Sequence, residues 1–483
     1  MYKSQVYLNI IKSNFLKNSF WLTTAQGLNG VLNLFLAIYL ARTFGPTVYG
    51  QFAYALSFVA LFSTLFDFGL TMAVTREFAK DNTQEQHFQS LFFLKSVIGI
   101  LVVLLISALS FFATKDHTVR QVIIMLGLYQ LFIQSLNLFY AVFRARQRME
   151  FEAFIRLFQI ASLAIAVFVM AWFGHSIMAI SMAYALATFF SLIVTIVCVC
   201  MFSDQKVFSF NLKLSLSVGK KFLLIGFYLA LAQGVGEVMT NTDSFLLGYW
   251  GMVKGVGFYN AANKINAMVL FPMSIISTAI FPILTTALKK SEHEFMRYWT
   301  SWMKYTIFFA VLVTFLVIAK AEDLINLFYT SEYLPASQTL KILMVMAIFV
   351  YLGNFYFQVL LVMNHQRQVF YGLLCGSALN VLLNFILIPR LGIEGSALAS
   401  VVGQLASGVF YFAIVSRVAF FGSLNRKFVN MLGMAVTSGL LMWYGLAVVN
   451  LPMYTSIFAG ILLYSALFFI LTKNFQKLVV RYE

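Results

Sequence analysis

Polar side chains interrupt a long apolar stretch at residues 232–250, AQGVGEVMTNTDSFLLGYW, and helical spacing brings several of them onto one face. The pattern i, i+4, i+8 and i+11 is formed by Gln233, Glu237, Asn241 and Ser244. A charged side chain at the centre of a membrane span costs ~2.5–3.5 kcal/mol, and it usually faces the protein interior or a water-filled cavity. We therefore predict that this face lines a central path, and that Glu237 is the candidate for binding a coupling ion, H⁺ or Na⁺.

Two other carboxylates have different predicted roles. Asp243 lies six residues after Glu237, which places it ~120° around a helix and nearer the outer end of the segment. Asp67, in LFDFGLTMAVTRE, lies near the inner end of an earlier apolar segment, where pairing with Arg76 or capping of a helix end would satisfy it. We assign gating or structural roles to Asp67, Arg76 and Asp243.

Amide side chains mark the first apolar segment in a similar way. Gln26, Asn29 and Asn33 form a polar stripe that repeats the one at Gln233 and Glu237, but without a charge. One interpretation is that these amides also line the central path. The alternative is hydrogen bonding between helices, worth about 1 kcal/mol for each bond.

Cations also occur inside or beside apolar segments. Lys95 and Arg156 lie early in their segments, where they either face the central path or extend along the lipid to the headgroups. Lys264, in NAANKINAM, lies farther from a basic flank and is a candidate for the lining of the path.

The sequence offers little for catalysis. The five histidines lie far apart in connections, and the three cysteines lie in apolar segments without zinc-like spacing. HExxH, GxSxG and P-loop motifs do not occur. No connection is long enough for a catalytic domain, so we predict a protein that is not an enzyme and that has no metal or other cofactor beyond a coupling ion.

The composition is that of a membrane protein. Of 483 residues, 61% are hydrophobic and 10% are charged, whereas globular proteins have roughly 45–50% and about 25%. Apolar segments of about 20 residues, long enough to cross a bilayer as helices, recur along the whole chain. The predicted fold class is therefore all-α integral membrane, with fourteen spans at 18–41, 51–73, 88–113, 120–143, 154–173, 178–202, 222–249, 258–287, 302–320, 337–363, 369–389, 395–416, 428–449 and 453–472.

The basic residues indicate the orientation of these spans. The formal net charge is +16, which by itself would suggest a nucleic-acid partner. However, twenty-two of the 33 lysines and arginines fall in alternate connections, and only seven fall in the others. This is the positive-inside pattern, so we predict cytoplasmic N- and C-termini, no nucleic acid, and contact with membrane lipids.

The first and seventh spans resemble each other, which indicates an internal repeat. AQGLNGVLNLFLAIYLARTFGPTVYGQFAYA, from Ala25, aligns without a gap with AQGVGEVMTNTDSFLLGYWGMVKGVGFYNAA, from Ala232. A second pairing matches Gln147 with Gln366. Because six spans separate the copies, the repeats are parallel, and transporters of this design bind substrate near the bilayer midplane. The predicted division is an N-terminal lobe at 1–205, a C-terminal lobe at 206–420, and two extra helices with a cytoplasmic tail at 421–483.

Several stretches in order along the chain carry a family resemblance. They are ARTFGPTVYGQFAYA, DFGLTMAVTRE, DSFLLGYWGMVKGVGFYNAANKI and ALNVLLNFILIPRLGIEGSALAS. With them the chain resembles O-antigen and polysaccharide (Wzx-type) flippases of the multidrug/oligosaccharidyl-lipid/polysaccharide (MOP) exporter superfamily. The resemblance implies a V-shaped, two-lobed transporter of a bacterial inner membrane. It would move an undecaprenyl-diphosphate-linked oligosaccharide from the inner to the outer leaflet by alternating access.

The resemblance also implies roles for particular residues. Arg42, Lys95, Arg156 and Lys264 are the cavity cations that would suit the diphosphate, since arginine and lysine both recognise phosphates. The last two helices would lie along the lipid tail. We expect a monomer, with a polysaccharide polymerase and a chain-length regulator as protein partners. The alternative is a cation-coupled exporter of drugs or other small molecules from the same superfamily, although the first span has amides where drug exporters often carry an acid.

Overall fold

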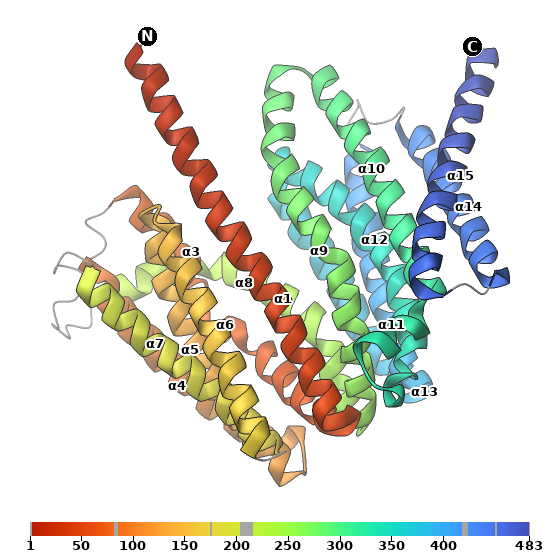
Figure 1. Cartoon of the computed structure of the whole chain (residues 1–483). Coiled ribbons are helices and arrows are strands. Elements are labelled where there is room, and N and C mark those ends of the chain that lie inside the picture. Colours follow the sequence, from red (N-terminus) through yellow and green to blue (C-terminus); the bar gives the residue numbers. More distant parts are fainter. Residues whose placement is uncertain are drawn as a thin grey trace. The chain divides into compact units, whose positions relative to one another are not determined.

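The computed structural model describes residues 2–81, 86–173, 176–202, 216–417, 424–449 and 452–482. Within these residues, all the regular structure is helical, and twelve helices are long and apolar enough to cross a membrane. Two of them, α1 (Tyr2–Leu61) and α13 (Gln366–Val415), each contain a glycine with non-helical backbone angles. Helix α1 covers the first predicted span and the beginning of the second, and α13 covers two predicted spans. The prediction of an all-α protein with fourteen spans is therefore confirmed (Figure 1).

The interruption of α1 follows from two adjacent residues. Gly45 has a φ of 72°, in the left-handed region that glycine adopts without a steric cost. Pro46 then begins the second part of the helix, because its fixed φ suits a first helical turn and its missing N–H is not needed there. Gly392, with a φ of 60°, interrupts α13 three residues after Pro389.

The second span differs from the predicted continuous helix at 51–73. After α1 ends at Leu61, the chain forms a five-residue helix, α2 (Ser63–Asp67), and then α3 (Leu70–Lys80). Phe68 and Gly69 between them both have left-handed backbone angles. A Cβ atom at Gly69 would clash with the backbone of Gly226, so the break also allows a close backbone contact with a neighbouring helix.

The N-terminal unit is one of two compact parts of the chain and comprises Met1–Lys254. After α3 it contains α4 (Phe88–Ala113), α5 (His117–Ala145), α6 (Met149–Phe173), α7 (Ile177–Phe202) and α8 (Leu216–Tyr249). Helix α8, the seventh predicted span, packs against α1, α2, α3 and α4. The fully buried side chains of the unit include Phe78, Phe88, Phe139, Tyr140 and Phe222.

The C-terminal unit, Gly255–Glu483, is built around aromatic side chains. Its helices are α9 (Val253–Lys290), α10 (Glu292–Ala319), α11 (Ala321–Phe328), the 3₁₀ turn η2 (Ser331–Tyr333), α12 (Ala336–Val362), α13, α14 (Leu424–Val448) and α15 (Met453–Tyr482). The rings of Trp299 and Trp302 each lie 4.6 Å from the ring of Phe355. Helices α14 and α15 pack against each other and against α10 (Figure 1).

Two turns in different units have the same geometry, which supports the internal repeat. Between α5 and α6, Gln147 has a φ of 55° and the N–H of Arg148 donates to Phe143 O at 2.9 Å. Between α12 and α13, Asn364 has a φ of 60°, and the next N–H donates to Leu360 O at 2.8 Å. In the structure Gln147 therefore corresponds to Asn364, whereas the sequence alignment matched Gln147 with Gln366, two residues later. The lobe boundaries at 205 and 420 stay a prediction from the repeat.

Candidate functional site

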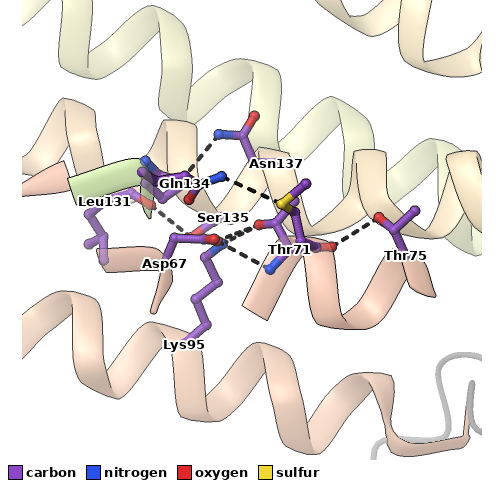
Figure 2. Close-up of polar contacts among 10 residues, drawn as sticks. Asp67, Thr71, Thr75, Lys95, Leu131, Gln134, Ser135 and Asn137 are labelled. Atoms are coloured by element: carbon purple, nitrogen blue, oxygen red, sulfur yellow. Dashed lines mark hydrogen bonds and ion pairs between the residues drawn. The ribbon is translucent and has the colours of Figure 1, made fainter. Parts of the chain in front are cut away.

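A buried ion pair lies at the break in the second span. The Nζ atom of Lys95 on α4 contacts Oδ1 of Asp67, the last residue of α2, and the exposed fractions of the two side chains are 2% and 8%. Thr71 on α3 joins them: its hydroxyl donates to Asp67 and lies 3.0 Å from Lys95 Nζ. Figure 2 shows the three side chains converging from three helices. Since an isolated buried charge is costly, this pairing holds α2, α3 and α4 together.

The pair corrects two expectations about these residues. Lys95 does not extend to the headgroups, because its ammonium group ends in the buried contact with Asp67. Asp67 does not pair with Arg76; the guanidinium Nε of Arg76 lies 3.9 Å from Glu77 instead, and the arginine side chain is 65% exposed. The other predicted role of Asp67, at a helix end, agrees with the backbone N–H of Thr71, in the first turn of α3, which donates to its carboxylate at 3.4 Å. The left-handed turn after Asp67 directs its carboxylate toward α4, whereas Arg76 lies beyond that turn on α3.

At the end of α3, outside the apolar segment, the hydrogen bond from Lys80 lowers the pKa of the Glu77 carboxyl.

Amide and hydroxyl side chains on the neighbouring helix α5 lie beside the ion pair. Asn137 Nδ2 donates to Gln134 Oε1 at 3.2 Å, and the Ser135 hydroxyl donates to Leu131 O at 2.8 Å (Figure 2). Gln134 and Asn137 are both only partly buried. The ion pair therefore borders a polar stretch of α5 that keeps some exposure.

The polar stripe of α8 lies against the same break from the other side. Glu237 is half-buried, accepts a hydrogen bond from Asn241 Nδ2 at 2.9 Å, and is also hydrogen-bonded to Ser63 on α2. Gln233 is exposed, and its side-chain amide lies 3.8 Å from the sulfur of Met72 on α3. The prediction that these polar residues share one face of the helix agrees with these contacts.

Helix α2 consequently contacts two charged centres. Ser63 at its start interacts with Glu237, and Asp67 at its end interacts with Lys95. The helix has five residues; Phe62 before it keeps right-handed backbone angles, and a left-handed turn follows Asp67.

The remaining predicted site residues lie in several different environments. Asp243 is 3% exposed, as is Ser244 of the predicted stripe, so its assignment to a different face from Glu237 stays a prediction. Gln26 and Asn33 are exposed and Asn29 is half-buried; Asn33 donates a hydrogen bond to Asn29 O at 2.9 Å. Arg42 is exposed near the end of the first span.

Arg156 belongs to a cluster whose acid the sequence reasoning missed. Glu152 is fully buried and accepts two hydrogen bonds from Arg144, at 2.8 and 2.6 Å, and one from Arg156 at 2.9 Å. The Arg156 guanidinium also lies 4.4 Å from the centre of the Tyr140 ring. Arg156 is therefore an internal partner of Glu152, and only the i, i+4 spacing of these two residues gave a signal for it.

Lys264 and a set of buried amides belong to the C-terminal unit. Lys264 is half-buried on α9. On α13, Asn384 donates to Asn380 O at 2.9 Å, and Asn380 donates to the Ser400 hydroxyl at 3.3 Å. These amides and the hydroxyl are at most 6% exposed, so they form a second polar centre within the apolar bundle.

These features define an all-α, multi-pass membrane protein with charged and amide groups buried between its spans. The chain belongs to the polysaccharide biosynthesis protein family, whose model matches residues 15–288. It is 21% identical over 396 residues, 81% of this chain and 94% of the other, to a protein of Escherichia coli K12 named "Putative O-antigen transporter". It is also 23% identical over 209 residues to an uncharacterized membrane protein of Methanocaldococcus jannaschii, a match that spans 41% of that protein.

Solved structures share the fold. The lipid II flippase MurJ, in an inward closed conformation, matches with a TM-score of 0.76 over 95% of this chain and 99% of that chain, at 15% identity. An inward-facing multidrug resistance MATE transporter of the MOP superfamily matches with a TM-score of 0.64 over 82% of this chain and 96% of that chain, at 14% identity. At these identities the likenesses show a shared fold, and the family match over residues 15–288 confirms the resemblance to polysaccharide biosynthesis proteins.

Proposed function

We propose that the protein is a flippase that moves an undecaprenyl-diphosphate-linked oligosaccharide repeat unit from the inner to the outer leaflet of a bacterial inner membrane. The observation that carries this proposal is the match to the "Putative O-antigen transporter", which extends over 94% of that protein. The family description and the MurJ-like fold support it. In this proposal the two lobes alternate in access, and both termini are cytoplasmic.

In the proposed chemistry, different side chains bind different parts of the substrate. Exposed or half-buried cations, Arg42 and Lys264, suit the diphosphate by charge. The exposed amides Gln26, Asn33 and Gln233 suit sugar hydroxyls, because an amide both donates and accepts hydrogen bonds. Lys95 and Arg156 are already paired with Asp67 and Glu152, so we assign them to holding the helices rather than to first contact with substrate.

Deletion in the native host tests the proposal. Without the protein, lipid-linked repeat units should accumulate facing the cytoplasm and the surface polysaccharide should be lost. A host without a second flippase is needed for a clear result, and a plasmid-borne copy should restore the polysaccharide. Normal surface polysaccharide in such a deletion strain would contradict the proposal.

For the driving force, we propose that Glu237 takes up H⁺ or Na⁺ and that α2 passes the change to the Asp67–Lys95 pair. Glu237 combines partial exposure with a direct contact to α2, whereas Asp243 is buried. Glu237→Gln should reduce transport more than the matched Asp243→Asn change. Wild-type transport by the Gln variant at several pH values would remove this mechanism.

A cation-coupled exporter of drugs or other small molecules is the second candidate. The observations in its favour are the MATE-like fold and the carboxylate within the α8 stripe. Expression in a strain that lacks its own exporters, followed by measurement of dye efflux, tests it. Efflux that depends on this protein and on Glu237 would favour this candidate over the flippase.

The proposed setting includes further molecules. We propose that the protein acts as a monomer among membrane lipids, next to the polymerase and the chain-length regulator of the same polysaccharide system. Cross-linking in the native membrane, followed by mass spectrometry, would identify these partners. Recovery of the protein only as a homodimer would contradict the monomer.

A further inference from the structure

A cavity of about 260 Å³ lies among the helix ends of the N-terminal unit, away from the α2 and α8 contacts. Its wall combines the start of α4, the last turns of α5 and α7, and the first turns of α6. One water molecule occupies about 30 Å³ in the liquid, so the volume suits a segment of a larger molecule. The volume is close to the lower limit of ~300 Å³ for ligand pockets.

The wall of this cavity changes from apolar to charged along its length. Phe88 and Phe139 are each 1% exposed, pack against each other with ring centroids 5.2 Å apart, and belong to its apolar part. At the other end are Phe154, which is 61% exposed, and Arg148, which is also exposed. A ligand that fits such a wall has an apolar chain on one side and an anionic group on the other.

The charged residues of the wall are confined to one short segment, the turn between α5 and α6 and the start of α6. They are Arg146, Arg148 and Glu150. This segment joins two membrane-spanning helices, so it lies at the depth of the lipid headgroups, whereas Phe139 lies six residues inside the end of α5, toward the acyl chains. The division of the cavity therefore coincides with the division of the bilayer.

Neighbouring charges make the mouth basic. Arg144, in the same stretch, is bound to Glu152, which also binds Arg156, so that cluster adds a net positive charge behind the wall. Among the residues that line the cavity, the one acid is Glu150. A basic segment at a membrane surface attracts anionic lipids by ~1 kcal/mol for each lysine or arginine, which is about five-fold in affinity.

We propose that this cavity is a binding site for an anionic glycerophospholipid, with one acyl chain along the apolar part of the wall and the phosphate against Arg148. The site is separate from the proposed substrate path and does not depend on the flippase function. Its occupant would join the ends of α4, α5, α6 and α7 and so stabilise the N-terminal unit. Neutral lipids match only the apolar part of the wall.

Cys198 provides a direct readout because it lines the cavity and is partly exposed. The other two cysteines, Cys200 and Cys375, are exposed and can be replaced by serine. The rate at which N-ethylmaleimide modifies Cys198 is then measured in lipid-depleted detergent while phosphatidylglycerol is added. The rate should fall by about five-fold or more and reach a plateau, while diacylglycerol with the same chains should leave it nearly unchanged.

Two variants connect the protection with the charged end of the cavity. Arg148→Gln should raise the half-protecting concentration of phosphatidylglycerol by about five-fold, and Arg148→Lys should retain protection close to that of the parent. Arg367→Gln is the matched control, because Arg367 follows the equivalent turn in the C-terminal unit; it should change nothing. Thermal unfolding of each variant shows that the chain is folded.

Three outcomes would overturn the proposal. The first is equal protection by phosphatidylglycerol and diacylglycerol, because the phosphate would then have no role. The second is no protection by either lipid. The third is protection by undecaprenyl phosphate at lower concentrations than phosphatidylglycerol, because the cavity would then belong to a polyprenyl carrier.

Discussion

The buried pair of Asp67 and Lys95 allows a sharp test of what holds the broken second span in place. Replacing Lys95 by methionine keeps the apolar bulk of the side chain and removes its charge. Asp67 then stays in a site where its side chain is 8% exposed, with Thr71 as its remaining hydrogen-bond donor. Removal of one partner from a buried pair costs about 3–5 kcal/mol, and we expect the lower end of that range because Thr71 still donates to the carboxylate.

The double variant separates the cost of an unpaired charge from the value of the pair. Lys95→Met combined with Asp67→Leu removes both charges, and replacement of a buried pair by apolar residues is often neutral or stabilising. The double variant should therefore be more stable than Lys95→Met alone. A double-mutant cycle built from thermal and chemical unfolding in detergent gives the coupling free energy.

The matched control is an exposed pair in the C-terminal unit. Lys341 Nζ lies 3.0 Å from Glu322, and the two side chains are 33% and 63% exposed. Such surface pairs contribute about 0–1 kcal/mol, so Lys341→Met should change stability little. If Lys95→Met were as mild as Lys341→Met, the pair would not hold the three helices together and the reasoning would be refuted.

Three further predictions concern other parts of the chain, and each is checked by thermal unfolding in detergent. Gly69→Ala should lower the free energy of unfolding by more than ~1–2 kcal/mol, because alanine there combines a left-handed backbone angle with a clash against α8. Gly30→Ala, where an added Cβ atom meets nothing within 4 Å, should be neutral or slightly stabilising, and equal effects of the two changes would contradict the close contact. Glu152→Gln should lower the free energy of unfolding by roughly 2–3 kcal/mol, since it weakens charge-assisted hydrogen bonds from two arginines. A change near zero would mean that solvent already satisfies the two arginines. Trp299→Ala should cost about 3–5 kcal/mol because the residue is 2% exposed and its ring packs against that of Phe355. Unchanged stability would show that this aromatic cluster is not the core of the C-terminal unit.

The sequence by itself determined where the chain crosses the membrane. The apolar run at 88–113 coincides with α4, and the runs at 120–143 and 178–202 lie within α5 and α7. Span length is a local property, set by the thickness of the hydrocarbon layer and by the need to satisfy every backbone N–H and C=O inside it. The α8 stripe was also predictable, because a periodic polar pattern depends only on helical geometry.

Only the tertiary structure decided which buried charges meet. The break between α2 and α3 depends on the close approach of Gly226 to Gly69, and apolar periodicity carries no signal for it. Lys95 and Asp67 lie 28 positions apart on different helices, and Glu152 binds an arginine on either side of a turn. A buried charge must find a partner wherever packing places one, so the identity of that partner is a property of the packed bundle and not of the local sequence.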